Sequence, residues 1–244
     1  MRRIPKLSLF PWLTLLVGAV GCGLQHWLLS SIDSKGLLPA HHPATALTLL
    51  LLAVFLVVCA MGVQPLSRIG HYAVLFPRSP VAVVGNLAAA AGFLFRSFSL
   101  FATSGKMGAP VLVLGIAAAL CALYAGYCRW TGTRSHYLAR VVICGFWMLH
   151  LTLSCRKWNA QPQLQLYLFP FLAAVFLLLS CYYRAVLDSQ KTSRRAYIFF
   201  TQGALLCCMF SMVGEDAPFH VAMALWMLTD CCRLSQTSGR YMKQ

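Results

Sequence analysis

Acidic residues are scarce in this chain. Asp and Glu number five among 244 residues, against 20 Lys and Arg, and only 10% of all residues are charged. A soluble domain carries roughly a quarter of charged residues, so this composition excludes an ordinary water-soluble protein. Five acids are also too few for the carboxylate relays that ion-coupled transporters place in the middle of the membrane. The acids are Asp33, Asp188, Glu215, Asp216 and Asp230.

Recognisable catalytic and nucleotide-binding motifs are missing as well. The sequence has no GxxxxGK[ST], because Gly105-Lys106-Met107 lacks the hydroxyl and the preceding glycine, and it has no GxSxG, HExxH or GxGxxG. No two histidines stand at HxH or HxxxH spacing on one helix face, which argues against a zinc site. We therefore expect no enzymatic activity, no metal and no cofactor.

The chain has long apolar segments instead. Hydrophobic residues make up 59% of it, and the mean hydropathy is +0.71. Several runs reach about 20 residues, the length that a helix needs to cross a bilayer. We predict an all-α fold, an integral membrane helical bundle of about eight transmembrane helices in four antiparallel hairpins, forming one polytopic domain over residues 1–244. The expected spans are residues 7–30, 44–63, 81–103, 109–128, 137–155, 164–183, 197–213 and 218–232.

The positions of the cations predict the orientation. The apolar run that begins at Leu164 ends in a strongly basic segment up to Arg195, and Lys and Arg are retained on the cytoplasmic side. With eight spans, fifteen Lys and Arg fall inside, four fall outside and Arg96 lies within a span. This predicts a plasma-membrane protein with both termini in the cytoplasm. The net charge of +15 then faces anionic lipid headgroups, and we expect no nucleic-acid partner.

Two charged residues near the expected inner surface have simple local explanations. Arg140 lies close enough to the inner end of its span to extend its guanidinium to the membrane surface. Asp230 lies one helical turn from Arg233, at a spacing that favours an ion pair. Both features predict surface charges without a role in the interior.

The eleven cysteines do not indicate a disulfide framework. In the predicted topology only Cys155 lies at the outer surface, where disulfides form. A loose lipoprotein cleavage box precedes Cys22, but the apolar run continues to Leu29 and is longer than the core of a signal peptide. We therefore expect no cleavage at Cys22, and we interpret the buried thiols as small apolar side chains.

The third expected span combines a stripe of small residues with an arginine. Small residues let membrane helices approach each other closely, because lipid supplies no hydrophobic drive between helices. A charged side chain inside a membrane is costly, so Arg96 must find a partner or extend to the outer headgroups. The adjacent acids Glu215 and Asp216, in the last outer hairpin, are the expected partners. The stripe consists of Gly85, Ala89, Gly92, Arg96, Ser99 and Thr103.

Polar residues gather toward the expected outer side of the bundle. They could line an outward-facing pocket for a small polar or anionic ligand, or they could be interfacial residues scattered where polarity costs little. Arg156 and Lys157, in the outer loop after the fifth span, could hold a lipid phosphate or an anionic ligand, or they could anchor the helix at the interface. The candidate ligand-binding residues are Arg96, Glu215, Asp216, His150, His220, His26, Arg156 and Lys157.

Part of the second half is similar to a known group of proteins. The segments RKWNAQPQLQLY, from Arg156, and YYRAVLD, from Tyr182, are followed by a basic loop. Together they resemble uncharacterised multi-span membrane proteins of gut anaerobic bacteria, roughly from the fifth span to the C-terminus. The resemblance implies a location in the bacterial inner membrane and brings no activity with it.

Three classes of function remain open. The polar residues toward the outer side favour a membrane subunit that binds or transports a ligand. The missing motifs and the basic inner loops favour a sensor or accessory protein that acts through partner membrane proteins or through copies of itself. An intramembrane enzyme is the third class, which no catalytic pair in the sequence supports.

Overall fold

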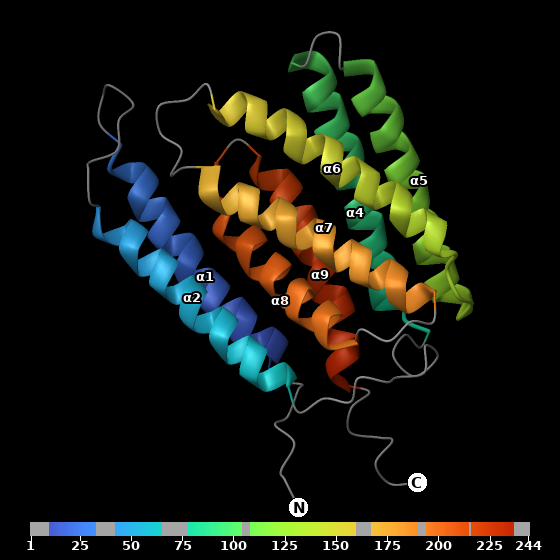
Figure 1. Cartoon of the computed structure of the whole chain (residues 1–244), viewed down its shortest axis with the longest axis horizontal. Coiled ribbons are helices and arrows are strands. Elements are labelled where there is room, and N and C mark those ends of the chain that lie inside the picture. Colours follow the sequence, from blue (N-terminus) through green and yellow to red (C-terminus); the bar gives the residue numbers. More distant parts are fainter. Residues whose placement is uncertain are drawn as a thin grey trace, which may run out of the picture.

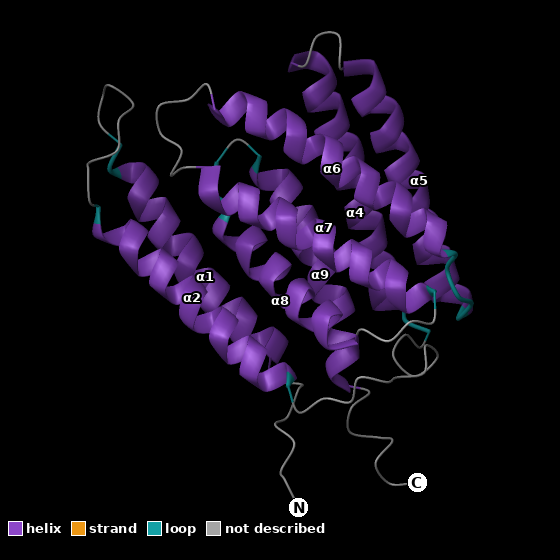
Figure 2. Ribbon diagram, viewed as in Figure 1, coloured by secondary structure: helices purple, strands orange, loops and turns teal. Residues whose placement is uncertain are grey.

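The structure, a computed structural model, describes residues 10–32, 42–64, 78–103, 108–159, 167–189, 194–214 and 216–236. Within these ranges the regular structure is helical and no strand occurs (Figure 2). The helices are α1 (Phe10–Ser30), α2 (Pro43–Val63), α4 (Pro80–Thr103), α5 (Gly108–Thr131), α6 (Tyr137–Asn159), α7 (Leu168–Asp188), α8 (Arg194–Phe210) and α9 (Ala217–Gln236). The predicted all-α class is confirmed for the described residues.

The expected spans and the observed helices agree within a few residues, except around α7. The apolar run predicts an end at residue 183, whereas α7 continues to Asp188 and ends with the Ser189 N–H donating to the Ala185 carbonyl at 2.9 Å. Hydropathy falls at the first arginine, but the backbone hydrogen bonds continue through it. Arg184 and Asp188 therefore lie on the helix, four residues apart, and not in a loop.

Six of the helices form a ring. Each helix from α4 to α9 packs on the next along the chain, and α4 packs on α9 to close the circle, while α1 and α2 pack on each other and on α8 (Figure 1). We call the end where α1 begins and α9 ends the base; the chain passes from α5 to α6 and from α7 to α8 there. The other end, with the α4–α5 and α8–α9 connections, is the crown.

Among the described helices, six are long and apolar enough to cross a membrane: α1, α2, α4, α5, α6 and α7. The chain is thus a multi-pass helical membrane protein. α8 has only 17 residues, and 12 of them are buried. It lies against α7, α9 and the α1–α2 hairpin, so protein surrounds it and its composition need not suit lipid.

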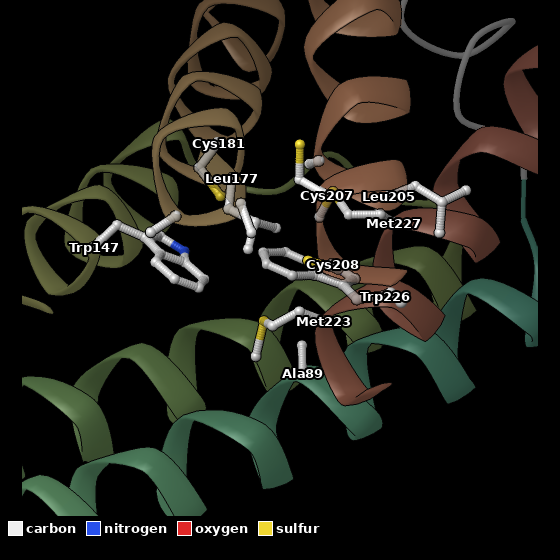
Figure 3. Close-up of a cluster of buried hydrophobic side chains, with 14 of the residues drawn as sticks. Ala89, Trp147, Leu177, Cys181, Leu205, Cys207, Cys208, Met223, Trp226 and Met227 are labelled. Atoms are coloured by element: carbon white, nitrogen blue, oxygen red, sulfur yellow. The ribbon is translucent and has the colours of Figure 1, made fainter. Parts of the chain in front are cut away.

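Aromatic side chains fill the middle of the ring. The Phe93 ring lies 6.0 Å from Trp147 and 5.9 Å from Trp226, all three almost fully buried. Trp147 and Trp226 come from α6 and α9 and enclose Met223 and Leu177 between them (Figure 3). The interior is therefore packed with side chains and leaves no open channel along these residues.

The small residues of α4 face α9, as the stripe predicts. A Cβ added to Gly85 would lie 1.9 Å from Thr229 Oγ1, and one added to Gly92 would lie 3.0 Å from the Ala222 Cβ. Contacts this short leave no room for a side chain, so the two helices approach closely along the stripe. Arg96, one turn beyond Gly92, is carried into the same contact and toward the first turn of α9.

Candidate functional site

Arg96 and Asp216 meet at the crown. Arg96 Nη1 forms an ion pair with Asp216 Oδ1. The Arg96 side chain is 9% exposed and that of Asp216 is 39% exposed, so the pair stands where the packed interior reaches the surface. The predicted pairing of Arg96 with one of the two adjacent acids is confirmed for Asp216. Glu215 lies outside the described residues.

Two of the predicted histidines join this pair around one aromatic ring. The Phe219 ring, on α9, lies 5.8 Å from Arg96 Cζ, 5.7 Å from the His150 ring and 5.4 Å from the His220 ring. Helices α4, α6 and α9, with the turn before α9, thus bring one arginine, one aspartate and two histidines together. We call these four residues and Phe219 the crown cluster.

Several buried polar atoms of the crown cluster have no hydrogen-bond partner. They are Arg96 Nε, His150 Nδ1 and His220 Nδ1, and the described part of the chain has others elsewhere, such as Trp147 Nε1 and Trp226 Nε1. His150 is 4% exposed and His220 is 5% exposed. An unsatisfied buried donor or acceptor costs about 1–3 kcal/mol, so three of them in one place need a physical reason. A polar ligand among these side chains would supply the missing partners.

Two further predicted residues, His26 and Arg156, do not join the crown cluster. His26 is exposed on α1, which packs on α2 and α8. Arg156 is exposed at the end of α6, and the side chain of Lys157 lies outside the described ones. Among the described residues, no group of three or more His, Cys, Asp or Glu could hold a metal ion.

A second set of buried charges lies at the base. Asp188, on α7, is 3% exposed, and its Oδ1 lies 3.3 Å from Arg184 Nε, while its Oδ2 lies 3.8 Å from Arg140 Nε. Ser135 Oγ donates a hydrogen bond to Oδ2 at 3.0 Å. Both arginines are 2% exposed. The expectation that Arg140 extends to the membrane surface is wrong, because its guanidinium lies inside the ring over the Trp226 face, at 5.8 Å.

The other basal aspartate continues this set. Asp230, on α9, accepts a hydrogen bond from Tyr197 Oη at 3.0 Å, and its Oδ1 lies 3.9 Å from Arg129 Nη2. The Tyr197 ring lies 5.8 Å from Arg184 Cζ and so joins the two halves. The carboxylate of Asp230 therefore points across the ring to α5 and α8. The side chain of Arg233, its predicted local partner, lies outside the described ones. These charged and hydrogen-bonded residues come from α5, α6, α7, α8, α9 and the α5–α6 connection, and we call them the basal network: Arg129, Ser135, Arg140, Arg184, Asp188, Tyr197 and Asp230.

The basal network was not predicted from the sequence. Arg129, Arg140 and Arg184 stand at the ends of apolar runs, where cations normally mark the cytoplasmic side. The available signal is numerical: Asp188 and Asp230 are two of only five acids, and each lies within a turn or so of an arginine. Phe219 carries no signal of its own, because one phenylalanine in an apolar helix resembles any other.

No family model, no curated protein and no solved structure matches this chain. The similarity to membrane proteins of gut anaerobes stays a prediction. Function must therefore be argued from the two charged sites themselves.

Proposed function

We propose that the protein is a membrane subunit that binds a small polar or anionic ligand at the crown cluster, as part of a transport or uptake system. The observation that carries this proposal is the set of three buried polar atoms without partners around Phe219. Natural proteins satisfy most buried polar groups, and exceptions gather where a ligand, water or ion belongs.

The chemistry of the crown cluster favours an anionic or hydrogen-bond-accepting group. Arg96 Nε is a donor in every state, and a guanidinium recognises carboxylate and phosphate groups in a planar, paired geometry. Asp216 engages Nη1 and holds the guanidinium in place. Each histidine can donate or accept at Nδ1, depending on its tautomer. The Phe219 ring supplies an apolar surface against which the rest of a small ligand can lie.

The ligand test compares the protein purified in native-membrane nanodiscs with two variants, by native mass spectrometry. A copurified small molecule should be present in the wild type and lost in Arg96→Gln, because that change removes the donor and keeps much of the side-chain volume. Arg156→Gln is the matched control, since it removes one cation from an exposed site near the crown. Wild-type protein without any bound small molecule, or a bound species that Arg96→Gln retains, would contradict the proposal.

The proposal includes eight membrane passes with the base in the cytoplasm. The support is the fifteen-to-four division of Lys and Arg between the predicted inner and outer segments of the sequence, together with the described helices, which alternate in direction. Reporter fusions should alternate between the two sides at successive connections. Two adjacent connections on the same side would overturn this topology. The fusion points are Lys6, Lys35, Arg78, Lys106, Arg134, Lys157, Arg195 and Lys243.

A further inference from the structure

The interior of the six-helix ring and the α1–α2 hairpin differ in how their buried polar groups are paired. In the described part of the hairpin, each buried polar side chain makes a hydrogen bond. The Thr14 and Thr48 hydroxyls donate to main-chain carbonyls at 2.8 and 2.9 Å, and the Gln25 amide donates to Thr48 Oγ1 at 3.4 Å. Inside the ring, buried polar atoms without a hydrogen-bond partner recur from the crown towards the base. Such exceptions mark places where water, an ion or a ligand belongs.

Several of these atoms lie on one face of α6. Trp147, His150 and Ser154 fall within about 60° of one another on a helix with 3.6 residues per turn. None of the three is more than 4% exposed, and Trp147 Nε1, His150 Nδ1 and Ser154 Oγ have no hydrogen-bond partner. Arg140 continues the same face towards the base. This buried face of α6 therefore carries a row of polar groups through the ring.

Contacts between rings connect the crown cluster with the base along this row. The Phe219 ring lies 5.6 Å from that of Trp147, and Phe93 contacts both Trp147 and Trp226. Trp226 Nε1 also has no hydrogen-bond partner, and the Trp226 ring lies 5.8 Å from Arg140 Cζ. We call Phe93, Trp147 and Trp226 the aromatic constriction. Its two tryptophans come from opposite sides of the interior and fill the middle of the row (Figure 3).

The row reaches the surface at both ends. At the base, Arg140 Nε lies 3.8 Å from Asp188 Oδ2, and Asp188 lines a cavity of about 430 Å³ among the ends of α5, α6 and α7. Tyr124 and Tyr137 also line this cavity and are exposed, so it opens to the surface. At the crown, the side chain of Asp216 is 39% exposed. The aromatic constriction separates the two ends.

We infer that this row is the passage by which a polar solute crosses the membrane, and that the aromatic constriction closes it in this structure. The inference rests on the proposed function, because the solute is the small polar or anionic ligand of the crown cluster. A solute with hydrogen-bonding groups, together with water, would pair with the indole, imidazole and hydroxyl groups of the α6 face. Rotation of the side chains of the aromatic constriction would connect the crown with the basal cavity.

Two native cysteines provide the test. Cys181, on α7, is 2% exposed and lies inside the ring, one turn nearer the base than Leu177, which packs at the aromatic constriction (Figure 3). Cys59, on α2, is 1% exposed and lies outside the ring, at a similar distance from the basal end of its helix. Cys155, near the crown end of α6, is partly exposed and identifies the crown side.

The reagent is sulfonatoethyl methanethiosulfonate, an anion that does not cross lipid. It is applied to one side of the membrane at a time, in intact cells and in inside-out vesicles, and peptide mass spectrometry measures the modification of each cysteine. From the side on which Cys155 reacts, Cys181 should react about tenfold faster than Cys59 or more, because Cys59 is reached through local unfolding. Equally slow modification of Cys181 and Cys59 would overturn the inference.

Trp147→Leu tests the position of the closure. The smaller side chain leaves space at the aromatic constriction, so the rate at Cys181 should rise about threefold or more. Trp130→Leu is the matched control, since Trp130 is 63% exposed on α5, and it should leave the rate unchanged. An unchanged rate in a folded Trp147→Leu would show that no route passes Trp147 and would overturn the inference. If the melting temperature shows that Trp147→Leu does not fold, the wild-type comparison still decides.

This outcome is separate from that of the ligand test. A copurified molecule that Arg96→Gln loses, together with an unreactive Cys181, would leave binding at the crown intact and overturn the passage. A reactive Cys181 in a protein without any bound small molecule would support the passage and contradict the proposed binding at the crown.

Discussion

The crown and the base solve the problem of buried charge in different ways. At the crown, one arginine meets one aspartate whose side chain is 39% exposed, so water reaches part of the pair. At the base, three arginines and two aspartates are each 2–3% exposed and are held by five helices. A pair at the surface is screened and contributes little, whereas a buried pair depends on every partner. We infer that the base holds the ring together and that the crown contributes less to stability.

The largest expected effect is at the base. Asp188→Asn removes the carboxylate that lies between Arg140 and Arg184 and leaves two buried guanidinium charges beside a neutral amide. Breaking a buried pair on one side costs about 3 to 5 kcal/mol. Thermal unfolding in detergent should show a much larger loss than for Asp216→Asn at the crown. Equal losses for the two variants would remove the distinction between crown and base.

Tyr197→Phe tests the second half of the basal network. The change deletes the hydroxyl that donates to Asp230 at 3.0 Å and keeps the ring that lies against Arg184. A hydrogen bond to a charged group contributes about 1.5 to 3 kcal/mol, and the loss should appear in equilibrium unfolding in mixed detergent and SDS. Tyr182→Phe, on the exposed side of α7, is the control and should unfold like the wild type.

Gly85→Ala tests whether close packing of α4 on α9 supports the basal half of the bundle. The new Cβ would lie 1.9 Å from Thr229 Oγ1, and Thr229 must then rotate and give up its 2.8 Å hydrogen bond to the Trp226 carbonyl. Overpacking costs about 1 to 3 kcal/mol. Gly23→Ala is the matched control, since a Cβ there meets no atom within 4 Å. A neutral Gly85→Ala would mean that the contact is looser than described.

The smallest expected effect is the coupling between Arg96 and Asp216. In a double-mutant cycle of Arg96→Leu and Asp216→Asn, the combined loss in melting stability should be less than the sum of the single losses. Coupling between polar side chains in membrane bundles averages about 0.6 kcal/mol and reaches about 1.7 kcal/mol. Strictly additive losses would show that Arg96 extends to the headgroups without relying on Asp216.

The positions of the helices could be predicted from the sequence, because each apolar run ends at polar or turn-forming residues. The α7 boundary could not, since hydropathy changes at Arg184 while helical hydrogen bonding continues to Asp188. For α8, length and composition favour a short span, and only the packing reveals that 12 of its residues are buried by other helices.

Part of the crown cluster, the pairing of Arg96 with Asp216, could be predicted from the sequence. Arg96 stands alone within an apolar span, where any charge demands an explanation. The basal arginines stand at the ends of spans, where a cation is already explained as a marker of the cytoplasmic side. Which side of a helix end faces inward depends on the rotation of that helix against its neighbours. That rotation, set by contacts between distant segments, placed Arg140 over Trp226.

The interior position of α8 also sets an order of assembly. Translation delivers α1, α2 and α7 before α8, yet all three contact it in the finished bundle. Until it arrives, Gly18 and Gly21 of α1 lack Met209 and Phe210, the side chains that pack on them. α8 therefore inserts, as a hairpin with α9, into a position that α1, α2 and α7 already border. A chain that stops after α7 would keep all six apolar helices and still leave the ring open.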